Sequence, residues 1–246
     1  MNLRLIGLST GAALAASTLG GCGAAQQDPQ CVVAKGAFAT VYTLKPGQDS
    51  SLACARLPPE RVGLEKYFSE DPSAPDTVAI RSRVVGDLLL NKNYQVDSTD
   101  VPLHPHSVGM LTTEAPGSDN FCEVPVFEQP TQVVLRSTTG GAGRSLSYAW
   151  YNLRVYNTPE IPGTQFTAEL RYTDNGCTAD YTVKGIWPVV SCATAGKPDD
   201  VKCDPRPDPA AGRHRGSGIN PSFPVKCDPV ALICVLTGEV PSDQHP

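Results

Sequence analysis

The chain has 246 residues, with 20 Lys and Arg against 25 Asp and Glu, which gives a formal net charge of −5 at pH 7. This acidic excess argues against a nucleic-acid partner, because phosphate contacts need clustered Lys and Arg. With 40% hydrophobic residues, 23 Pro and 22 Gly, the chain is expected to fold as one sizeable domain with many turns.

The first 21 residues have the three parts of an export signal. Arg4 is the only charged residue before Asp28, and residues 5–19 are uncharged and rich in Leu, Ala and Gly. This apolar segment has the length of a signal peptide and is too short to cross a membrane as a helix. We therefore expect residues 1–21 to be removed on export, and residues 22–30 to form a short tether.

The signal ends in Leu19-Gly20-Gly21-Cys22, which resembles the lipobox of Gram-negative bacterial lipoproteins. The resemblance implies that the Cys22 thiol receives a diacylglycerol, that the chain is cut before Cys22 and that the new amine is acylated with a chain such as palmitate. Residue 23 is Gly and not the Asp of the usual inner-membrane retention signal, so the resemblance also implies that the protein is located in the outer membrane. Several acyl chains would make this attachment effectively permanent.

Nine cysteines are present, and setting Cys22 aside leaves an even number. An exported chain enters an oxidising compartment, so we expect four disulfides. The alternative, an ordinary signal peptide with Cys22 in a disulfide, conflicts with the odd total. The candidates are Cys31, Cys54, Cys122, Cys177, Cys192, Cys203, Cys227 and Cys234. Short separation favours Cys227 with Cys234, Cys177 with Cys192 and Cys31 with Cys54, leaving Cys122 with Cys203.

Residues 31–196 are expected to form a β-rich domain. A strand is predicted within residues 32–55, before the loop that carries Cys54, and a short helix at residues 60–68. Residues 77–94 are apolar and partly β-branched, which indicates a strand with a bulge or turn at Gly86-Asp87, although a helical turn fits residues 88–90 as well.

The clearest β-pattern lies between residues 132 and 192. Four Val-, Thr-, Tyr- and Phe-rich segments are separated by turn residues, at 132–137, 148–156, 165–172 and 177–188. Asp174-Asn175-Gly176 indicates a tight hairpin, because Asn and Gly tolerate the positive φ that such turns require. The fold class predicted is mainly β, an antiparallel β-sandwich or partly closed barrel stapled by disulfides.

Residues 197–246 are expected to form a Pro/Gly-rich, Cys-containing C-terminal arm. Residues 197–224 contain six Pro and three Gly, which disfavours regular structure and predicts an extended arm. The pentapeptide Val-Lys-Cys-Asp-Pro occurs at residues 201–205 and again at residues 225–229, and we interpret it as two similar Cys-bearing turns. Residues 230–236 are apolar and are expected to dock back on the domain as an edge strand.

One motif could carry metal chemistry. His104 and His106 flank a proline, and an extended segment would point both imidazoles to the same side. Asp97, Asp100 or Glu114 could complete such a site, but two histidines are not a metal site, and a solvated loop is the simpler interpretation.

Two classes of function follow. The first is a non-enzymatic, lipid-anchored envelope protein with a binding, assembly or structural role at the outer membrane. Its partners are the membrane, through the lipid anchor, and an envelope protein that the sequence does not identify. No cofactor is expected beyond the covalent diacylglycerol and N-acyl chain on Cys22. The alternative is a membrane-anchored hydrolase or metalloenzyme that uses His104, His106 and a nearby carboxylate. A lipobox before a Cys- and Pro-rich β-domain is similar to myxobacterial outer-membrane lipoproteins.

Overall fold

The computed structural model describes residues 29–71 and 73–242, so Cys22 and the predicted signal peptide lie outside the described residues. Ten strands form one antiparallel sheet in the order β4-β7-β8-β9-β10-β1-β2-β3-β5, with β6 paired to β8. They are β1 (Gly36–Leu44), β2 (Glu60–Tyr67), β3 (Thr77–Ser82), β4 (Tyr94–Val96), β5 (Ser107–Met110), β6 (Phe121–Val126), β7 (Thr131–Ser137), β8 (Arg144–Asn157), β9 (Pro162–Asp174) and β10 (Cys177–Ile186). The mainly β, antiparallel prediction is confirmed.

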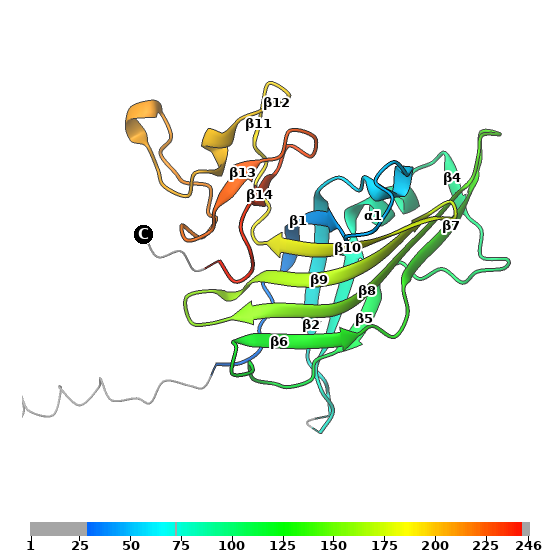
Figure 1. Ribbon diagram of the computed structural model, residues 1–246, viewed down its shortest axis with the longest axis horizontal. Helices are drawn as coiled ribbons and strands as arrows, with labels where there is room; N and C mark the ends of the chain where they lie inside the picture. Colours follow the sequence, from blue (N-terminus) through cyan, green and yellow to red (C-terminus); the bar gives the residue numbers. More distant parts are fainter. Residues whose placement is uncertain (1–28, 72, 243–246) are drawn as a thin grey trace, which may run out of the picture.

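The sheet curves so that its two halves face each other. Figure 1 shows β10, β9, β8 and β6 in front of β2 and β5. Isolated antiparallel bridges join Gly109 to Phe127 and His104 to Gln132, which brings β5 beside the segments that follow β6 and begin β7. The structure is therefore partly closed and is not a closed barrel.

The core lies between the two halves of the sheet and follows the two-residue period of the strands. The largest fully buried side chains include Tyr148, Tyr181, Phe38, Phe166 and Leu64. Phe38 and Phe166 meet edge to face, with ring centroids 5.3 Å apart. This contact joins β1 to β9 over the intervening β10, and apolar contacts within such a core are the main source of its stability.

The helix predicted at residues 60–68 is wrong, because this segment is strand β2. Glu60, Val62 and Leu64 are buried in alternation with Arg61 and Gly63, which is the period of a strand and not of a helix.

The helix of this region comes later. β3 ends at Ser82, and α1 (Arg83–Leu90) follows it, so the bulge or turn predicted at Gly86-Asp87 is also wrong. The Ser82 side chain accepts a hydrogen bond from the Val84 N–H and caps the helix. The strand predicted from residue 77 is confirmed at residues 77–82, and the helical turn considered for residues 88–90 agrees with the end of α1.

The hairpin predicted at residues 174–176 is confirmed. β9 and β10 pair from Cys177 opposite Asp174 along their length, and the two residues between them have positive φ, 49° for Asn175 and 84° for Gly176. These are the left-handed conformations that this type of turn requires.

All eight predicted cysteines form disulfides, but each predicted pairing is wrong. The bonds are Cys31–Cys122, Cys54–Cys177, Cys192–Cys227 and Cys203–Cys234. The first two close loops of 91 and 123 residues, because they join segments that only the folded sheet brings together. Short separation along the chain is therefore a poor guide in this fold.

The C-terminal segment is not an extended arm, and it forms a small folded lobe at one end of the sheet (Figure 1). It contains the short strands β11 (Ala193–Thr194), β12 (Lys197–Pro198), β13 (Val225–Cys227) and β14 (Cys234–Leu236) and the 3₁₀ turns η3 (Asp200–Cys203) and η4 (Pro209–Ala211); a further turn, η2 (Ala53–Ala55), precedes β2. Two disulfides and a second apolar cluster hold it together, and that cluster includes Ala39 of β1 and Ile186 of β10.

Residues 230–236 dock on the domain as predicted, since β14 contacts β1 and β10. They do not form an edge strand of the main sheet, because β14 pairs with β13 in a separate hairpin. The two Val-Lys-Cys-Asp-Pro copies have different structures, since the first enters η3 and the second enters β13. Among the described helices, none has the length and apolar character to cross a membrane.

Candidate functional site

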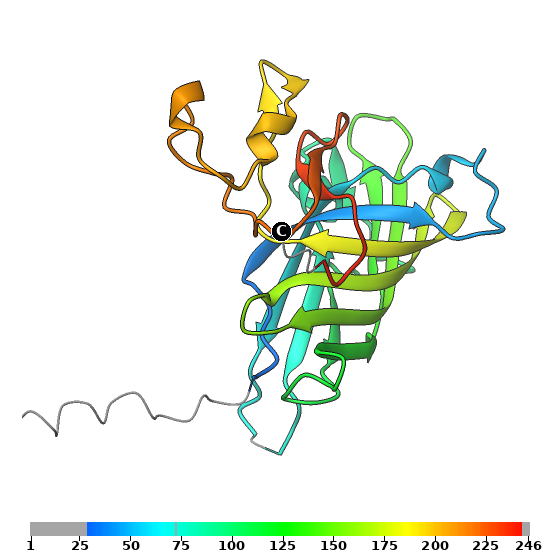
Figure 2. The same ribbon diagram turned by 60° about the vertical axis from the view of Figure 1, so that its left-hand side comes forward.

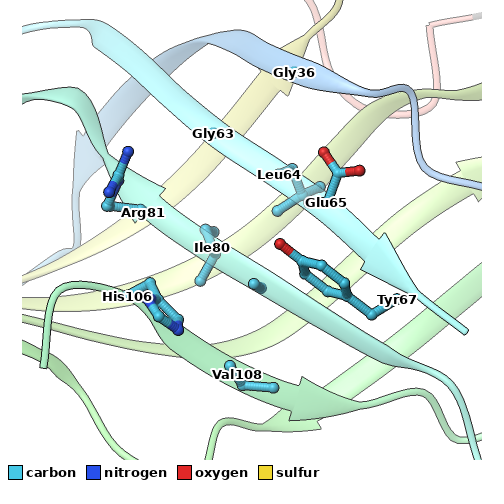
Figure 3. Close-up of a pocket in the computed structure, with 10 residues that line it drawn as sticks. Gly36, Gly63, Leu64, Glu65, Tyr67, Ile80, Arg81, His106 and Val108 are labelled. Atoms are coloured by element: carbon cyan, nitrogen blue, oxygen red, sulfur yellow. The ribbon is translucent and has the colours of Figure 1, made fainter. Parts of the chain in front are cut away.

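The outward face of β2, β3 and β5 carries a shallow hollow with a volume of about 330 Å³ (Figure 3). The strand register pairs Ala79 of β3 with Glu65 of β2 on one side and with Val108 of β5 on the other. Gly63 lies opposite Arg81 in the same register. Because Gly63 and Ala79 have almost no side chain, the larger residues around them enclose a depression.

The two ends of the hollow differ in polarity. In Figure 3, Arg81 and His106 lie at one end, and Glu65 and Tyr67 lie at the other, with the Tyr67 hydroxyl directed inward. Ala79 and Val108 line the hollow between them, whereas the side chain of Ile80 belongs to the core on the other face of β3. The hollow thus joins a cationic end to an end with a carboxylate and a phenol, across a partly apolar floor.

The charged groups of the hollow remain accessible. Glu65 contacts Lys35 at 3.4 Å, but Lys35 is 84% exposed, and ion pairs of this kind contribute little. Arg81 is exposed and forms no ion pair within the described part of the chain. The lining residues include no Ser, Thr or Cys, so the hollow offers charges and hydrogen-bonding groups and no hydroxyl or thiol nucleophile of these types.

A second group of polar residues surrounds Glu60, on the inner face of β2. The buried carboxylate of Glu60 accepts hydrogen bonds from the Tyr42 hydroxyl at 2.8 Å, from the Ser82 hydroxyl at 2.5 Å and from the Val84 N–H at 3.3 Å. Burial raises the pKa of Glu60, and these hydrogen bonds oppose that effect. Glu60 thereby connects β2 to the first turn of α1, which is a structural role.

Burial also raises the pKa of the neighbouring phenols. The pKa values of Tyr42 and Tyr148 lie well above the ordinary value, first because both are desolvated and second because the Glu60 charge is near. These phenols stay protonated and act as packing and hydrogen-bonding groups. An acidic residue at an inward position of an alternating strand, as in Glu60, Val62 and Leu64, was the sequence signal for this cluster.

A buried ion pair lies where the described chain begins. The Lys66 ammonium lies 2.7 Å from Asp76 Oδ2, and the two side chains are 8% and 9% exposed. It also donates to the Cys31 carbonyl at 2.8 Å and lies 3.6 Å from Glu114. The hydrogen bond from Lys66 lowers the pKa of Asp76. The pair connects the first described residues to the loop between β2 and β3, whose Ser69 N–H also donates to Asp76.

The residues proposed for a metal site have other neighbours in the structure. His106 lines the hollow, whereas the backbone of His104 pairs with Gln132. Asp97 binds Arg136 at 2.7 Å, and this hydrogen bond is the main reason that its pKa falls to about 2.

Among the described residues, neither histidine belongs to a group of three potential metal ligands. The group that does occur there consists of Cys192, Cys203 and Cys234, whose sulfurs are already bonded in disulfides.

Comparisons with known proteins identify relatives over most of the chain. A family model described as MlpA matches residues 36–188. A Myxococcus xanthus protein named "Putative lipoprotein MlpA" is 32% identical over 238 residues, which cover 93% of each chain. No solved structure matches the chain. The resemblance to myxobacterial lipoproteins is thereby confirmed, and the chain belongs to the MlpA family.

Proposed function

We propose that this protein is a lipoprotein of the outer membrane, anchored through Cys22 after removal of residues 1–21. The observation that carries the proposal is the pairing of the cysteines. The eight cysteines of the described chain pair with one another in four disulfides, which accounts for every cysteine except Cys22. The remaining thiol is the one in the lipobox-like sequence, and the relative named a lipoprotein aligns over 93% of its length.

The anchor is tested by labelling cells of a Gram-negative host with an alkyne analogue of palmitate. The wild-type protein should incorporate the label and partition into detergent, whereas Cys22→Ala should stay unlabelled and retain its signal peptide. A wild-type protein without label that partitions wholly into the aqueous phase would contradict the proposal.

The outer-membrane location is tested separately with Gly23→Asp. This variant restores the inner-membrane retention residue without touching Cys22. In a density gradient of membranes, the variant should move to the inner-membrane fraction while the wild type stays with the outer membrane. Identical positions for the two proteins, both in the inner membrane, would exclude the location and leave the anchor intact.

The function of the folded domain is then binding, and the hollow on β2, β3 and β5 is its site. The site matches a small ligand with an anionic group for Arg81 and His106 and an apolar body for the floor. At a distance of a few ångströms an accessible guanidinium is well suited to a carboxylate or phosphate, because its planar N–H groups can bind two oxygens at once.

Benzoate is a suitable probe because it combines a carboxylate with a flat apolar ring. In an NMR titration of the detergent-solubilised protein, benzoate should shift the His106 ring resonances, and the shift should be lost in Arg81→Ala. Arg61→Ala is the matched control, since Arg61 is exposed on the same strand pair and does not line the hollow. Equal benzoate responses in the two variants would contradict the assignment of this site.

A further inference from the structure

One end of the curved sheet exposes a row of large apolar side chains. Phe68 is 80% exposed, Tyr67 56% and Met110 53%. The register places Tyr67 opposite Thr77, and Thr77 opposite Met110, so Tyr67 and Met110 lie on the same face of the sheet. Phe68 follows at the end of β2, where its ring packs against the Lys66 ammonium. We call Tyr67, Phe68 and Met110 the apolar rim. Val126, 70% exposed, continues it, because the bridge between Gly109 and Phe127 sets Val126 beside Met110.

The rim lies at the end of the domain where the described chain begins. The Cys31 carbonyl accepts a hydrogen bond from Lys66, the residue before Tyr67. The Cys31 N–H donates to the Glu114 carbonyl, a few residues after Met110. Figures 1 and 2 both show the blue start of the chain and the loop between β2 and β3 at the same lower end of the molecule.

A cleft of about 880 Å³ lies between these segments and is lined by residues of both, among them Gln30, Cys31 and Phe68. The first residues of the domain and the rim therefore share one surface.

The tether keeps this end close to the anchor. Residues 23–30 separate Cys22 from the disulfide-bonded Cys31. The nine residue steps from Cys22 to Cys31 span at most about 32 Å even when fully extended. The end of the domain that carries Cys31 cannot be farther than that from a lipid on Cys22, whereas the opposite end can lie much farther away.

The charges around the rim favour an electrically neutral lipid surface. Glu70, Asp71 and Glu114 are exposed there, and Lys66 is already neutralised by Asp76. Anionic lipids attract clusters of basic residues, and this end of the domain offers carboxylates instead. Aromatic and other amphipathic side chains, in contrast, partition into the headgroup region of any bilayer.

We propose that the apolar rim rests on the membrane surface and fixes the orientation of the domain beside its anchor. The inference relies on the proposed lipid on Cys22, which brings the rim within reach of the bilayer. Phe68 inserts its ring just below the lipid headgroups, among the first carbons of the acyl chains, and Tyr67 and Met110 contact the headgroup layer beside it. The hollow, which shares Tyr67 with the rim, then opens beside the membrane.

The test uses the full lipidated chain in phosphatidylcholine vesicles whose acyl chains carry bromine, which quenches tryptophan on contact. Phe68→Trp places the probe at the rim. Val230→Trp is the matched control, because Val230 is 75% exposed in the connection between β13 and β14, at the upper end of the molecule in Figures 1 and 2. Fluorescence of the wild type, with Trp150 and Trp187, is subtracted from both.

Brominated lipid should remove fluorescence from Phe68→Trp and leave Val230→Trp unchanged, and adding anionic phosphatidylglycerol should not increase the loss. If both variants float with the vesicles and the tryptophan at residue 68 is unquenched, the rim inference is wrong while the anchor stands. A blue-shifted but unquenched tryptophan would assign the rim to a protein contact and would equally overturn the proposal. If neither variant floats, the anchor itself fails, and the inference that relies on it fails too.

Discussion

Replacing Lys66 with methionine removes one partner of a nearly buried ion pair. Lys66 and Asp76 are 2.7 Å apart with side chains 8% and 9% exposed, so little solvent screens the charge that remains. In Lys66→Met the Asp76 carboxylate keeps the Ser69 N–H as a donor but loses its cation. Breaking a buried pair in this way costs about 3–5 kcal/mol of unfolding free energy. We expect about 3 kcal/mol, because the methionine still packs along the path of the lysine stem.

Urea unfolding with the disulfides intact, followed by tryptophan fluorescence, measures this cost. A loss of about 3 kcal/mol should lower the midpoint by about 1–3 M, given the usual dependence on urea. The control is Lys35→Ala, which breaks the exposed pair with Glu65 and should cost at most about 1 kcal/mol. Equal midpoint shifts in the two variants would refute the reasoning that burial makes the Lys66 pair important.

The same pair predicts a pH dependence. The pKa of Asp76 is lowered in the folded state, so its contribution to stability is complete above the unfolded value of about 3.9 and is lost as the pH falls through the folded pKa. The wild type should therefore lose stability in acid more steeply than Lys66→Met. Parallel acid unfolding curves for the two proteins would contradict this assignment.

Three other predictions follow from the core and the surface. Replacing both Cys54 and Cys177 with Ala opens a loop of 123 residues and should lower the unfolding free energy by about 4–5 kcal/mol, because the unfolded chain gains conformational entropy. The urea midpoint should fall, and an unchanged midpoint would argue against the disulfide. Because the pKa of Glu60 is raised in the folded state, the wild type should lose stability as the pH rises from the unfolded value of about 4.3 through the folded pKa. Glu60→Gln should lose less stability over that range. A difference in unfolding free energy that stays constant with pH would contradict this role of Glu60. Arg136→Ala should raise the pKa of Asp97 from about 2 towards its ordinary value in an NMR titration, and an unmoved titration would show that Arg136 is not its cause.

The strands of the second half of the sheet could be predicted because their signals are local. A turn such as Asn175-Gly176 determines its own conformation, and the runs on either side alternate with the period of a strand. The sequence of β2 favours a helix because the strand is short and because Tyr67 and Phe68 add two apolar residues in succession, which hides the alternation of Glu60, Val62 and Leu64.

The disulfide pairings and the hollow could not be predicted, because both depend on long-range register. Cys54 and Cys177 are 123 residues apart, and their sulfurs meet only after the turn before β2 packs on β10. Likewise His106 was evident as a candidate, but its neighbours Arg81 and Glu65 come from other strands. The Pro and Gly content of residues 197–224 correctly indicates an absence of long elements, yet two disulfides fold the C-terminal segment on itself, and its apolar cluster packs against Ala39 and Ile186 of the sheet.

The most direct test of the account is the intact mass of the natural protein extracted from membranes, measured before and after reduction. The account predicts a chain that begins at Cys22 and carries a diacylglycerol and an acyl group, with a mass that increases on reduction by the hydrogens of four disulfides. A chain that still begins at Met1, or one that begins near residue 22 without lipid, would contradict it.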